Sequence, residues 1–371
     1  MSTIANKLAR EELVDMVPYQ SARRLYASGS DTSSVQNKIW LNANEAPGAG
    51  KYNINSSSIN RYPDFQPDNL INAYCEYSGL SPENILATRG ADEGIELIIR
   101  TFCKAYQDSI LICPPTYGMY AISAENHGAD IVRVPLINNQ LDLDSMKTQV
   151  GQVKVVFLCS PGNPTGNLLT TKSIKAALEL FGDTAIVVVD EAYIEFSPEN
   201  TKANWIKDYP QLVVLRTLSK AFALAGLRCG FTLANPDIIT MLSKVIAPYP
   251  ISAPVADIAS EAIVGKGLEQ MNTRVQQTVT LRAQLFDWLN NQNWSVNVFE
   301  SDANFILFQT ADTKTKNFIF DCLKQQDILI RDQSAQLQLA NCLRISIGSE
   351  RELSLLKQTI INAFSHATSE T

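Results

Sequence analysis

Residues 153–166 read VKVVFLCSPGNPTG, an almost continuous apolar run followed by a turn rich in Pro, Gly and Asn. A run of this kind is typical of a strand buried on both faces of a mostly parallel sheet. The side chains of the turn then lie beyond the carboxyl end of the strand, where open α/β sheets bind their ligands. We therefore expect a central strand over 153–158 and a contribution to a ligand site from 160–166.

The same pattern continues on both sides of this stretch. Apolar runs bounded by polar turns recur at residues 85–88, 109–113, 130–134, 185–189 and 212–215. The segments between them, such as Thr171 to Phe181 and Asp92 to Cys103, have helical spacing and suit crossover helices. The alternation from about 85 to 260 predicts an α/β fold, with a mostly parallel sheet in a large α/β/α domain.

The pattern changes near residue 265. A long helical stretch at 267–290 precedes short apolar runs at 296–298, 305–308, 328–330 and 343–347, with helices expected at 314–325 and 350–363. This predicts a smaller C-terminal α+β domain. A helix over 4–17 and a strand at 39–41 are expected near the N-terminus. We divide the chain into an N-terminal arm (1–38), a large domain (39–264) and a small domain (265–371).

Composition excludes several classes of function. The 371 residues suit two or three domains, and 45% hydrophobic residues with 19% charged residues suit a large core. A net charge of −7 argues against nucleic acid or an anionic membrane as the main partner. Only two histidines are present, His127 and His366, which argues against a His-rich metal site or a histidine-centred triad.

Cysteine placement and the N-terminus indicate the compartment. The seven cysteines form no C-x-x-C pair, which is typical of packed thiols in a reducing environment. Charged residues such as Lys7, Arg10 and Glu11 interrupt any apolar run that could be a signal peptide. No stretch reaches the roughly 18 apolar residues of a membrane helix. We expect a cytoplasmic protein.

Four motifs follow predicted strands, in this order: Ser160-Pro161-Gly162-Asn163-Pro164-Thr165-Gly166, Asp190-Glu191-Ala192-Tyr193, Thr217-Leu218-Ser219-Lys220-Ala221-Phe222 and Gly226-Leu227-Arg228-Cys229-Gly230. Each motif alone is weak or moderate evidence. Together they resemble the signature of the fold-type I pyridoxal-phosphate (PLP) aminotransferases. The resemblance implies PLP as cofactor in the large domain and no metal.

The chemistry of PLP explains the residue types at its reactive and phosphate ends. PLP forms a Schiff base with a lysine amine, and Lys220 is the candidate. A lone Lys after a strand is usually a solvated surface residue, and its neighbours reverse that interpretation here. Ser219 and Arg228 suit a phosphate, because a guanidinium donates paired hydrogen bonds. By itself Arg228 would be a surface ion pair.

A carboxylate facing the pyridine nitrogen keeps that nitrogen protonated, so that the ring can accept electrons. Asp190 ends a buried apolar strand, where an unpaired carboxylate is costly, so a cationic partner is expected. The alternative for Asp190 is a simple helix N-cap, and the residue alone does not separate the two. Asn163 and Tyr193 suit hydrogen bonds to the ring oxygen, although alone they would be a turn residue and a half-buried aromatic.

Two further segments fit the same cofactor. Arg89-Gly90-Ala91-Asp92-Glu93 opens a predicted helix, whose free backbone amides attract phosphate, so Ala91 and Asp92 are candidates there. Plain capping by Asp92 is the alternative and is compatible with the first. Tyr117, after a predicted strand, could stack on the cofactor ring or simply belong to the core.

Over nearly the whole chain the sequence resembles the histidinol-phosphate aminotransferase family. The segments that carry this resemblance are 18–23, 41–45, 60–64, 89–93, 114–120, 330–332 and 342–348. The resemblance implies a homodimer with shared active sites, in which Tyr62 reaches the PLP phosphate of the neighbouring subunit. It also implies substrate binding by these residues: Tyr19, Asn44, Glu45, Arg331 and Arg344. Taken alone, Arg331 could equally be a surface charge.

The implied reaction is the transfer of an amino group from L-histidinol phosphate to 2-oxoglutarate, which gives imidazole-acetol phosphate and L-glutamate in histidine biosynthesis. Lys220 would carry the proton as general base and acid. The nearest alternatives keep the fold: an aromatic-amino-acid aminotransferase or a threonine-phosphate decarboxylase. A PLP-binding regulatory protein without turnover is an alternative of another class, which the presence of Lys220 and the charge of −7 disfavour.

Overall fold

The computed structural model describes residues 4, 8–10, 13, 16, 38–48, 50–57 and 59–369, with side chains described up to residue 366. The helix expected over residues 4–17 therefore lies largely outside the described residues, and Tyr19 lies outside them entirely.

The centre of the fold is a seven-stranded sheet in the order β2-β8-β7-β6-β5-β3-β4. Its strands are β2 (Ile85–Thr88), β3 (Ser109–Ile112), β4 (Asp130–Arg133), β5 (Val155–Cys159), β6 (Ile186–Asp190), β7 (Leu212–Thr217) and β8 (Gly230–Ala234). Only the pairings of β8 with β2 and β7 are antiparallel. The α/β fold and the mostly parallel sheet are confirmed, whereas strand β8 was not anticipated.

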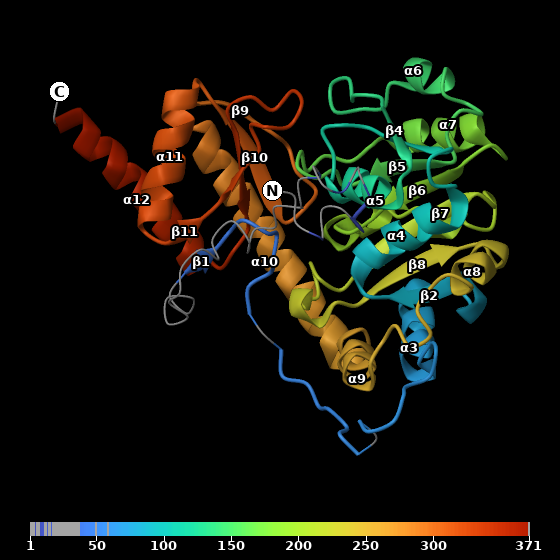
Figure 1. Cartoon of the computed structure of the whole chain (residues 1–371). Helices are drawn as coiled ribbons and strands as arrows, with labels where there is room; N and C mark the ends of the chain where they lie inside the picture. Colours follow the sequence, from blue (N-terminus) through green and yellow to red (C-terminus); the bar gives the residue numbers. More distant parts are fainter. Residues whose placement is uncertain are drawn as a thin grey trace.

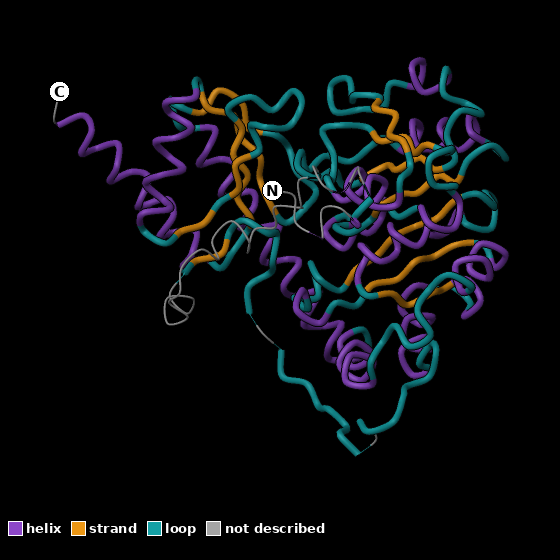
Figure 2. Tube along the Cα trace, viewed as in Figure 1, coloured by secondary structure: helices purple, strands orange, loops and turns teal. Residues whose placement is uncertain are grey.

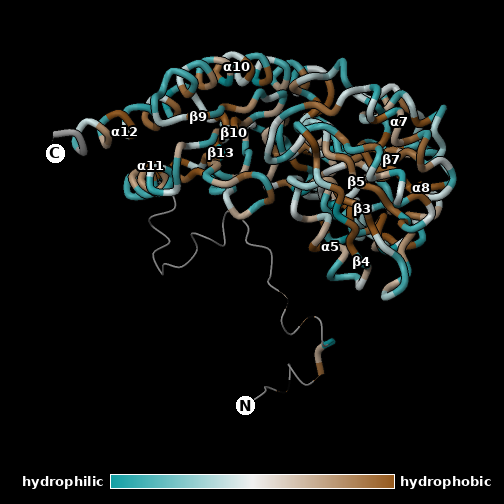
Figure 3. The backbone as a smooth tube through the Cα atoms, turned by 90° about the horizontal axis from the view of Figure 1, so that it is seen from above, coloured by the Kyte–Doolittle hydropathy of each residue, from teal (hydrophilic) through white to brown (hydrophobic). Residues whose placement is uncertain are grey.

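Helices cover both faces of this sheet (Figure 2). One core packs against α3 (Asp68–Ser78), α6 (Leu143–Lys147), α7 (Thr171–Phe181) and α9 (Ala253–Ala262). The other packs against α4 (Gly90–Phe102), α5 (Met119–His127) and α8 (Pro236–Ser243). Along β5, Val156 and Leu158 face the first core while Val155 and Phe157 face the second. Burial on both faces explains the continuous apolar run, and the sheet strands are hydrophobic in Figure 3.

The C-terminal part forms a second, antiparallel sheet in the order β12-β13-β10-β9. Its elements are α10 (Gly265–Asn290), β9 (Ser295–Val298), β10 (Phe305–Thr310), α11 (Thr313–Gln325), β11 (Ile328–Leu329), β12 (Arg331–Asp332), β13 (Cys342–Ser346) and α12 (Glu350–Ser369). Short 3-10 turns complete the chain: η3 (Pro82–Asn84), η4 (Ile194–Phe196), η5 (Pro198–Asn200), η6 (Ala203–Trp205) and η7 (Ala225–Leu227).

Helix α10 connects the two parts (Figure 1). Its Met271 packs in the core of the large sheet, while Leu285 and Leu289 pack in the core of the C-terminal part. Strand β1 (Ile39–Trp40), which we had assigned to the large domain, pairs in parallel with β11 instead. Leu41 follows it into the C-terminal core, so burial of this side chain places β1 there. The division into domains at residues 39 and 265 stays a prediction.

Within the residues that the structure describes, no helix is long and apolar enough to cross a membrane.

Candidate functional site

A cavity of about 650 Å³ lies beyond the carboxyl ends of β5, β6 and β7 and extends to the C-terminal sheet. It brings together all the predicted site residues except Tyr19 and Tyr62. The lining residues that the sequence predicted are Asn44, Glu45, Ala91, Asp92, Tyr117, Asn163, Asp190, Tyr193, Ser219, Lys220, Arg228, Arg331 and Arg344. The volume is in the range of small-molecule and cofactor sites.

Lys220 lies in the loop after β7 and lines this cavity. Its Nζ donates a hydrogen bond to the Ala43 carbonyl oxygen at 3.2 Å and lies 5.7 Å from the centre of the Tyr193 ring. Burial, reinforced by the positive charge of Arg344, lowers the pKa of Lys220 to about 8. The amine is therefore available in its neutral, nucleophilic form near physiological pH.

Asp190 ends β6 and is 2% exposed. Its Oδ2 accepts a hydrogen bond from the Tyr120 hydroxyl at 2.6 Å, and its Oδ1 accepts one from the Ala192 amide at 3.1 Å. Burial raises the pKa of Asp190 to about 6. Among the described residues no ion pair involves Asp190. The expected cationic partner therefore does not come from the described part of the chain, and a ligand with a protonated nitrogen would supply it.

The N-cap alternative for Asp190 does not match the structure. The next helical turn is η4, and its N-cap residue is Tyr193, whose side chain makes no cap hydrogen bond. The carboxylate instead points at Tyr120 and at the loop amide of Ala192.

Another part of the cavity lining suits an anion. Ala91 and Asp92 lie in the first turn of α4, whose free amides favour negative charge. Arg228 NH1 donates to Ser219 Oγ at 3.3 Å, and Arg228 NH2 donates to Asp92 Oδ2 at 3.1 Å. Gly90 has φ of 77°, and a Cβ there would stand 2.8 Å from Arg228 NH2, so glycine allows this close approach.

Asp92 does not cap α4 with its side chain. The Glu93 carboxylate accepts the hydrogen bond of the Arg89 amide at 2.7 Å instead. Asp92 Oδ1 accepts a hydrogen bond from the Tyr117 hydroxyl at 3.0 Å, so Asp92 connects Tyr117 to Arg228.

Two side-chain amides donate hydrogen bonds to the Tyr193 hydroxyl. Asn44 Nδ2 donates to it at 2.9 Å and Asn163 Nδ2 at 3.2 Å. Asn44 belongs to the segment after β1, so this contact ties the N-terminal part of the chain to the loops of the large sheet. Asn42 also lines the cavity, is buried, and has no hydrogen-bond partner for either side-chain amide atom among the described residues.

The C-terminal sheet contributes two arginines. Arg331 of β12 stands directly opposite Arg344 of β13 in the antiparallel ladder. Like charges opposite one another destabilise a sheet, so an anionic ligand between them would offset a cost that the fold carries. Arg344 is 6% exposed and donates to Asn163 Oδ1 and to the Asn42 carbonyl oxygen.

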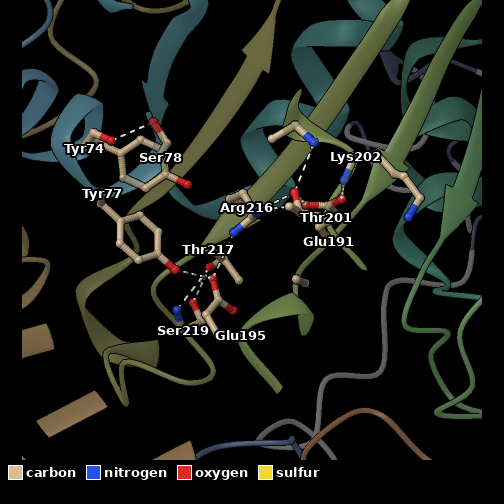
Figure 4. A network of polar contacts seen from close by, with 12 residues as sticks. Tyr74, Tyr77, Ser78, Glu191, Glu195, Thr201, Lys202, Arg216, Thr217 and Ser219 are labelled. Carbon is tan, nitrogen blue, oxygen red and sulfur yellow. Dashed lines mark hydrogen bonds and ion pairs between the residues drawn. The ribbon is translucent and has the colours of Figure 1, made fainter. Parts of the chain in front are cut away.

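A buried ionic network joins the loop after β6 to β7 (Figure 4). Arg216 of β7 donates to Glu191 at 2.8 Å, to Glu195 at 3.3 Å and to the Thr201 hydroxyl at 2.9 Å. Lys202 donates its backbone amide to Glu191. The network fastens the loop that follows Asp190 to the strand that precedes Lys220.

Sequence reasoning missed several lining residues: Thr116, Cys159, Gln333 and Gln336. Gln333 could have been found, because it stands two residues after Arg331 and so shares its face in an extended strand. It also missed Tyr120, whose partner Asp190 is 70 residues away in the chain.

Two predicted residues are not among the described lining residues of the cavity. Tyr62 is 81% exposed, does not line the cavity, and stacks on Tyr249 with ring centroids 4.5 Å apart. Tyr19 lies outside the described residues.

Comparison with known proteins shows the family of this chain. Residues 35–360 match the family model "Aminotransferase class I and II". A histidinol-phosphate aminotransferase from Colwellia psychrerythraea is 62% identical over 96% of this chain and 99% of its own. One from Yersinia pseudotuberculosis is 52% identical over 93% of this chain and 88% of its own.

The chain belongs to the histidinol-phosphate aminotransferase family.

Solved structures agree with the fold of this aminotransferase. The histidinol-phosphate aminotransferase of Clostridium acetobutylicum superposes with a TM-score of 0.78 at 25% identity, over 88% of this chain and 99% of the other. That of Sinorhizobium meliloti, solved in complex with pyridoxal-5'-phosphate, superposes with a TM-score of 0.81 at 22% identity, over 96% and 97%.

The residues present in the aminotransferase fit PLP. The lining contains a buried carboxylate without a cationic partner in the described chain, and separately a helix N-terminus with Arg228. These two features suit the pyridine nitrogen and the phosphate of PLP. The same lining contains a lysine with a lowered pKa.

Proposed function

We propose that this enzyme transfers the amino group of L-histidinol phosphate to 2-oxoglutarate, with PLP as cofactor. The products are imidazole-acetol phosphate and L-glutamate, as a step in histidine biosynthesis. The observation that carries the proposal is the joint placement of Lys220, Asp190 and the Arg331–Arg344 pair in one cavity of a chain that belongs to this family.

Nine residues would hold the cofactor together with Lys220. Ala91, Asp92, Ser219 and Arg228 would surround its phosphate, and Asp190 would face its ring nitrogen. Asn163 and Tyr193 would bind the ring oxygen, Tyr117 would stack on the ring, and Tyr62 would arrive from a second copy of the chain. When bound, PLP supplies an aldehyde that takes up the donor amine and a ring that accepts the electron pair left at Cα.

Lys220 would act as the general base and general acid of the reaction. Its Nζ, with a pKa of about 8, would accept a proton from the substrate Cα near neutral pH. The same amine would also donate that proton as general acid. Burial, together with the positive charge of Arg344, keeps the pKa of Lys220 low.

The arginine pair would recognise the anionic groups of both substrates. Histidinol phosphate carries a phosphate, while glutamate and 2-oxoglutarate carry two carboxylates each, and guanidinium groups bind both kinds of anion with paired hydrogen bonds. Arg331 and Arg344 line the same cavity as Asn44 and Glu45, and Arg344 donates a hydrogen bond to Asn163 Oδ1. Tyr19 of the N-terminal arm completes the proposed substrate site.

The proposal includes a homodimer with shared active sites and a cytoplasmic location. Tyr62 lies in an exposed position outside the cavity, which is where a residue that serves a neighbouring subunit would stand. The division into an arm, a large PLP-binding domain (39–264) and a small domain (265–371) belongs to the same proposal. Strand β1, at the N-terminal limit of this large domain, pairs with β11 of the small domain.

The test is the absorption spectrum of the PLP-loaded protein before and after addition of L-histidinol phosphate without any keto acid. Conversion of the cofactor to pyridoxamine phosphate, reversed by 2-oxoglutarate, is the expected result. Phenylalanine and threonine phosphate are tested in parallel, because an aromatic-amino-acid aminotransferase or a decarboxylase would respond to them instead. A Lys220→Ala variant that stays folded should lose turnover, and wild-type turnover in it would contradict the role of Lys220.

A further inference from the structure

The hydroxyl group of Tyr120 is a buried polar group that the proposed function leaves unused. Tyr120 lies in α5, is fully buried, and donates to Asp190 Oδ2 at 2.6 Å. That distance is typical of a hydrogen bond between a hydroxyl and an ionised carboxylate. The contact joins a helix on one face of the sheet to the end of a central strand.

The ring of Tyr120 is held from two sides. It stacks on Phe157 of β5 with centroids 4.7 Å apart and planes 10° apart. It also meets Tyr117 edge-on, with centroids 5.6 Å apart and planes at 87°. Phe157 is fully buried and Tyr117 lines the cavity. Because both rings pack against Tyr120, this packing fixes its hydroxyl without any ligand.

This geometry leaves Asp190 with few conformational choices. Tyr120 holds one carboxylate oxygen and the Ala192 amide holds the other. The second lone pair of each oxygen stays available for a ligand. A tyrosine hydroxyl is a weak acid, and burial with the neighbouring Asp190 charge raises its pKa well above the usual range. It therefore donates a hydrogen bond without giving up its proton, and the negative charge stays on Asp190.

We propose that Tyr120 is a positioning residue for the reaction, which orients Asp190 and keeps it ionised so that it can hold the proton of the cofactor's pyridine nitrogen. This inference rests on the proposed function, since it assumes that PLP occupies the cavity. Without the Tyr120 hydroxyl, Asp190 Oδ2 would be buried with no protein donor. The neutral acid would then be favoured, and the pyridine nitrogen would lose its ionised partner.

The test compares Tyr120→Phe with Tyr74→Phe. Tyr74 is also a buried tyrosine stacked on a phenylalanine, Phe231, but it belongs to the core on the other face of the sheet. Both variants lose one buried hydroxyl, so a general effect on stability is shared. The readouts are the 15N resonance of the pyridine nitrogen in bound, 15N-labelled PLP and the Kd of PLP for the apoprotein.

We expect Tyr120→Phe to move the 15N resonance towards that of a neutral pyridine and to raise the Kd of PLP about tenfold, the effect of losing a hydrogen bond to a charged group. Tyr74→Phe should leave both unchanged. An Asp190→Asn background separates positioning from a local structural effect: there Tyr120→Phe should change the Kd little, because the two residues act as one unit.

Two results would overturn the inference. The first is a Tyr120→Phe protein that binds PLP with the wild-type Kd and 15N resonance. The second is a Kd that rises by the same factor in the wild-type and Asp190→Asn backgrounds. Failure of the wild-type protein itself to bind PLP would instead contradict the proposed function, so the two failures are distinguishable.

Discussion

At the scale of single residues, the lowered pKa of Lys220 predicts how the rate of PLP binding to the apoprotein depends on pH. Only the neutral amine attacks the PLP aldehyde, and the pKa of this amine is about 8 because burial and Arg344 disfavour its charge. The rate of capture should therefore rise roughly tenfold between pH 7 and its plateau, with a midpoint near 8. Stopped-flow absorbance measures it. A rate that climbs only around the ordinary lysine pKa would contradict the environment described for Lys220.

Gly90 makes a second prediction at this scale. Gly90→Ala forces a side chain into a left-handed backbone and towards Arg228, whereas Gly79→Ala meets the same backbone restriction in open space. Both variants should lose about 1 kcal/mol of stability, but only Gly90→Ala should weaken PLP binding, on the order of tenfold. Urea unfolding and PLP titration measure the two effects. Equal PLP affinities in both variants would show that the contact of Gly90 with Arg228 is unimportant.

Residue chemistry also explains how much of the site was predictable. Lys220 and Asp190 follow strands and the motif of Arg228 comes after them in recognisable order, so the sequence predicts one shared site, and the structure brings the three residues into one cavity. Tyr120 carries no such signal. It stands in a helix among apolar residues, and only the packing of α5 against β5 brings its hydroxyl to Asp190.

At the scale of elements, the Arg216 network fastens the loop after β6 to β7 (Figure 4). Arg216→Met would leave Glu191 and Glu195 buried without their cation, which costs about 3–5 kcal/mol of unfolding free energy. Arg89→Met is the matched control, because its ion pair with Glu93 is solvent-exposed on the arginine side and contributes about 1 kcal/mol or less. Urea unfolding of the two apoproteins measures the difference, and equal losses would refute the structural role of the network.

Local patterns predicted the elements unevenly. Helix α7 runs from Thr171 to Phe181 as expected, because its apolar spacing is regular and Thr170 accepts a hydrogen bond from the Ser173 amide as N-cap. Strand β8 was missed, although Gly230–Ala234 is fully buried. The strand begins with a glycine and directly follows the motif around Arg228, so its apolar run does not stand out in the sequence. Its antiparallel position between β2 and β7 depends on pairing with strands that are distant in the chain.

At the scale of the whole molecule, the proposed dimer predicts exchange of function between subunits. If Tyr62 serves the neighbouring site, a mixed dimer of Lys220→Ala and Tyr62→Ala chains contains one site with both residues intact. Random refolding of an equal mixture makes about half of the dimers mixed, each with one of two sites intact, so about a quarter of wild-type activity should return. Activity no greater than the average of the two separate variants would show that Tyr62 does not act across subunits.

By itself, the sequence determined the α/β class with its mostly parallel sheet, the order of the strand-end motifs and the family, because buried runs and turn residues act locally and their spacing survives in the chain. It also indicated PLP, since Lys220, Asp190 and Arg228 differ in chemistry and each has its own part of one ligand to bind. Tertiary structure alone decided three matters: β1 pairs with β11, Arg331 faces Arg344, and Tyr120 reaches Asp190. Each joins segments distant in sequence, and their pairing depends on how whole layers pack.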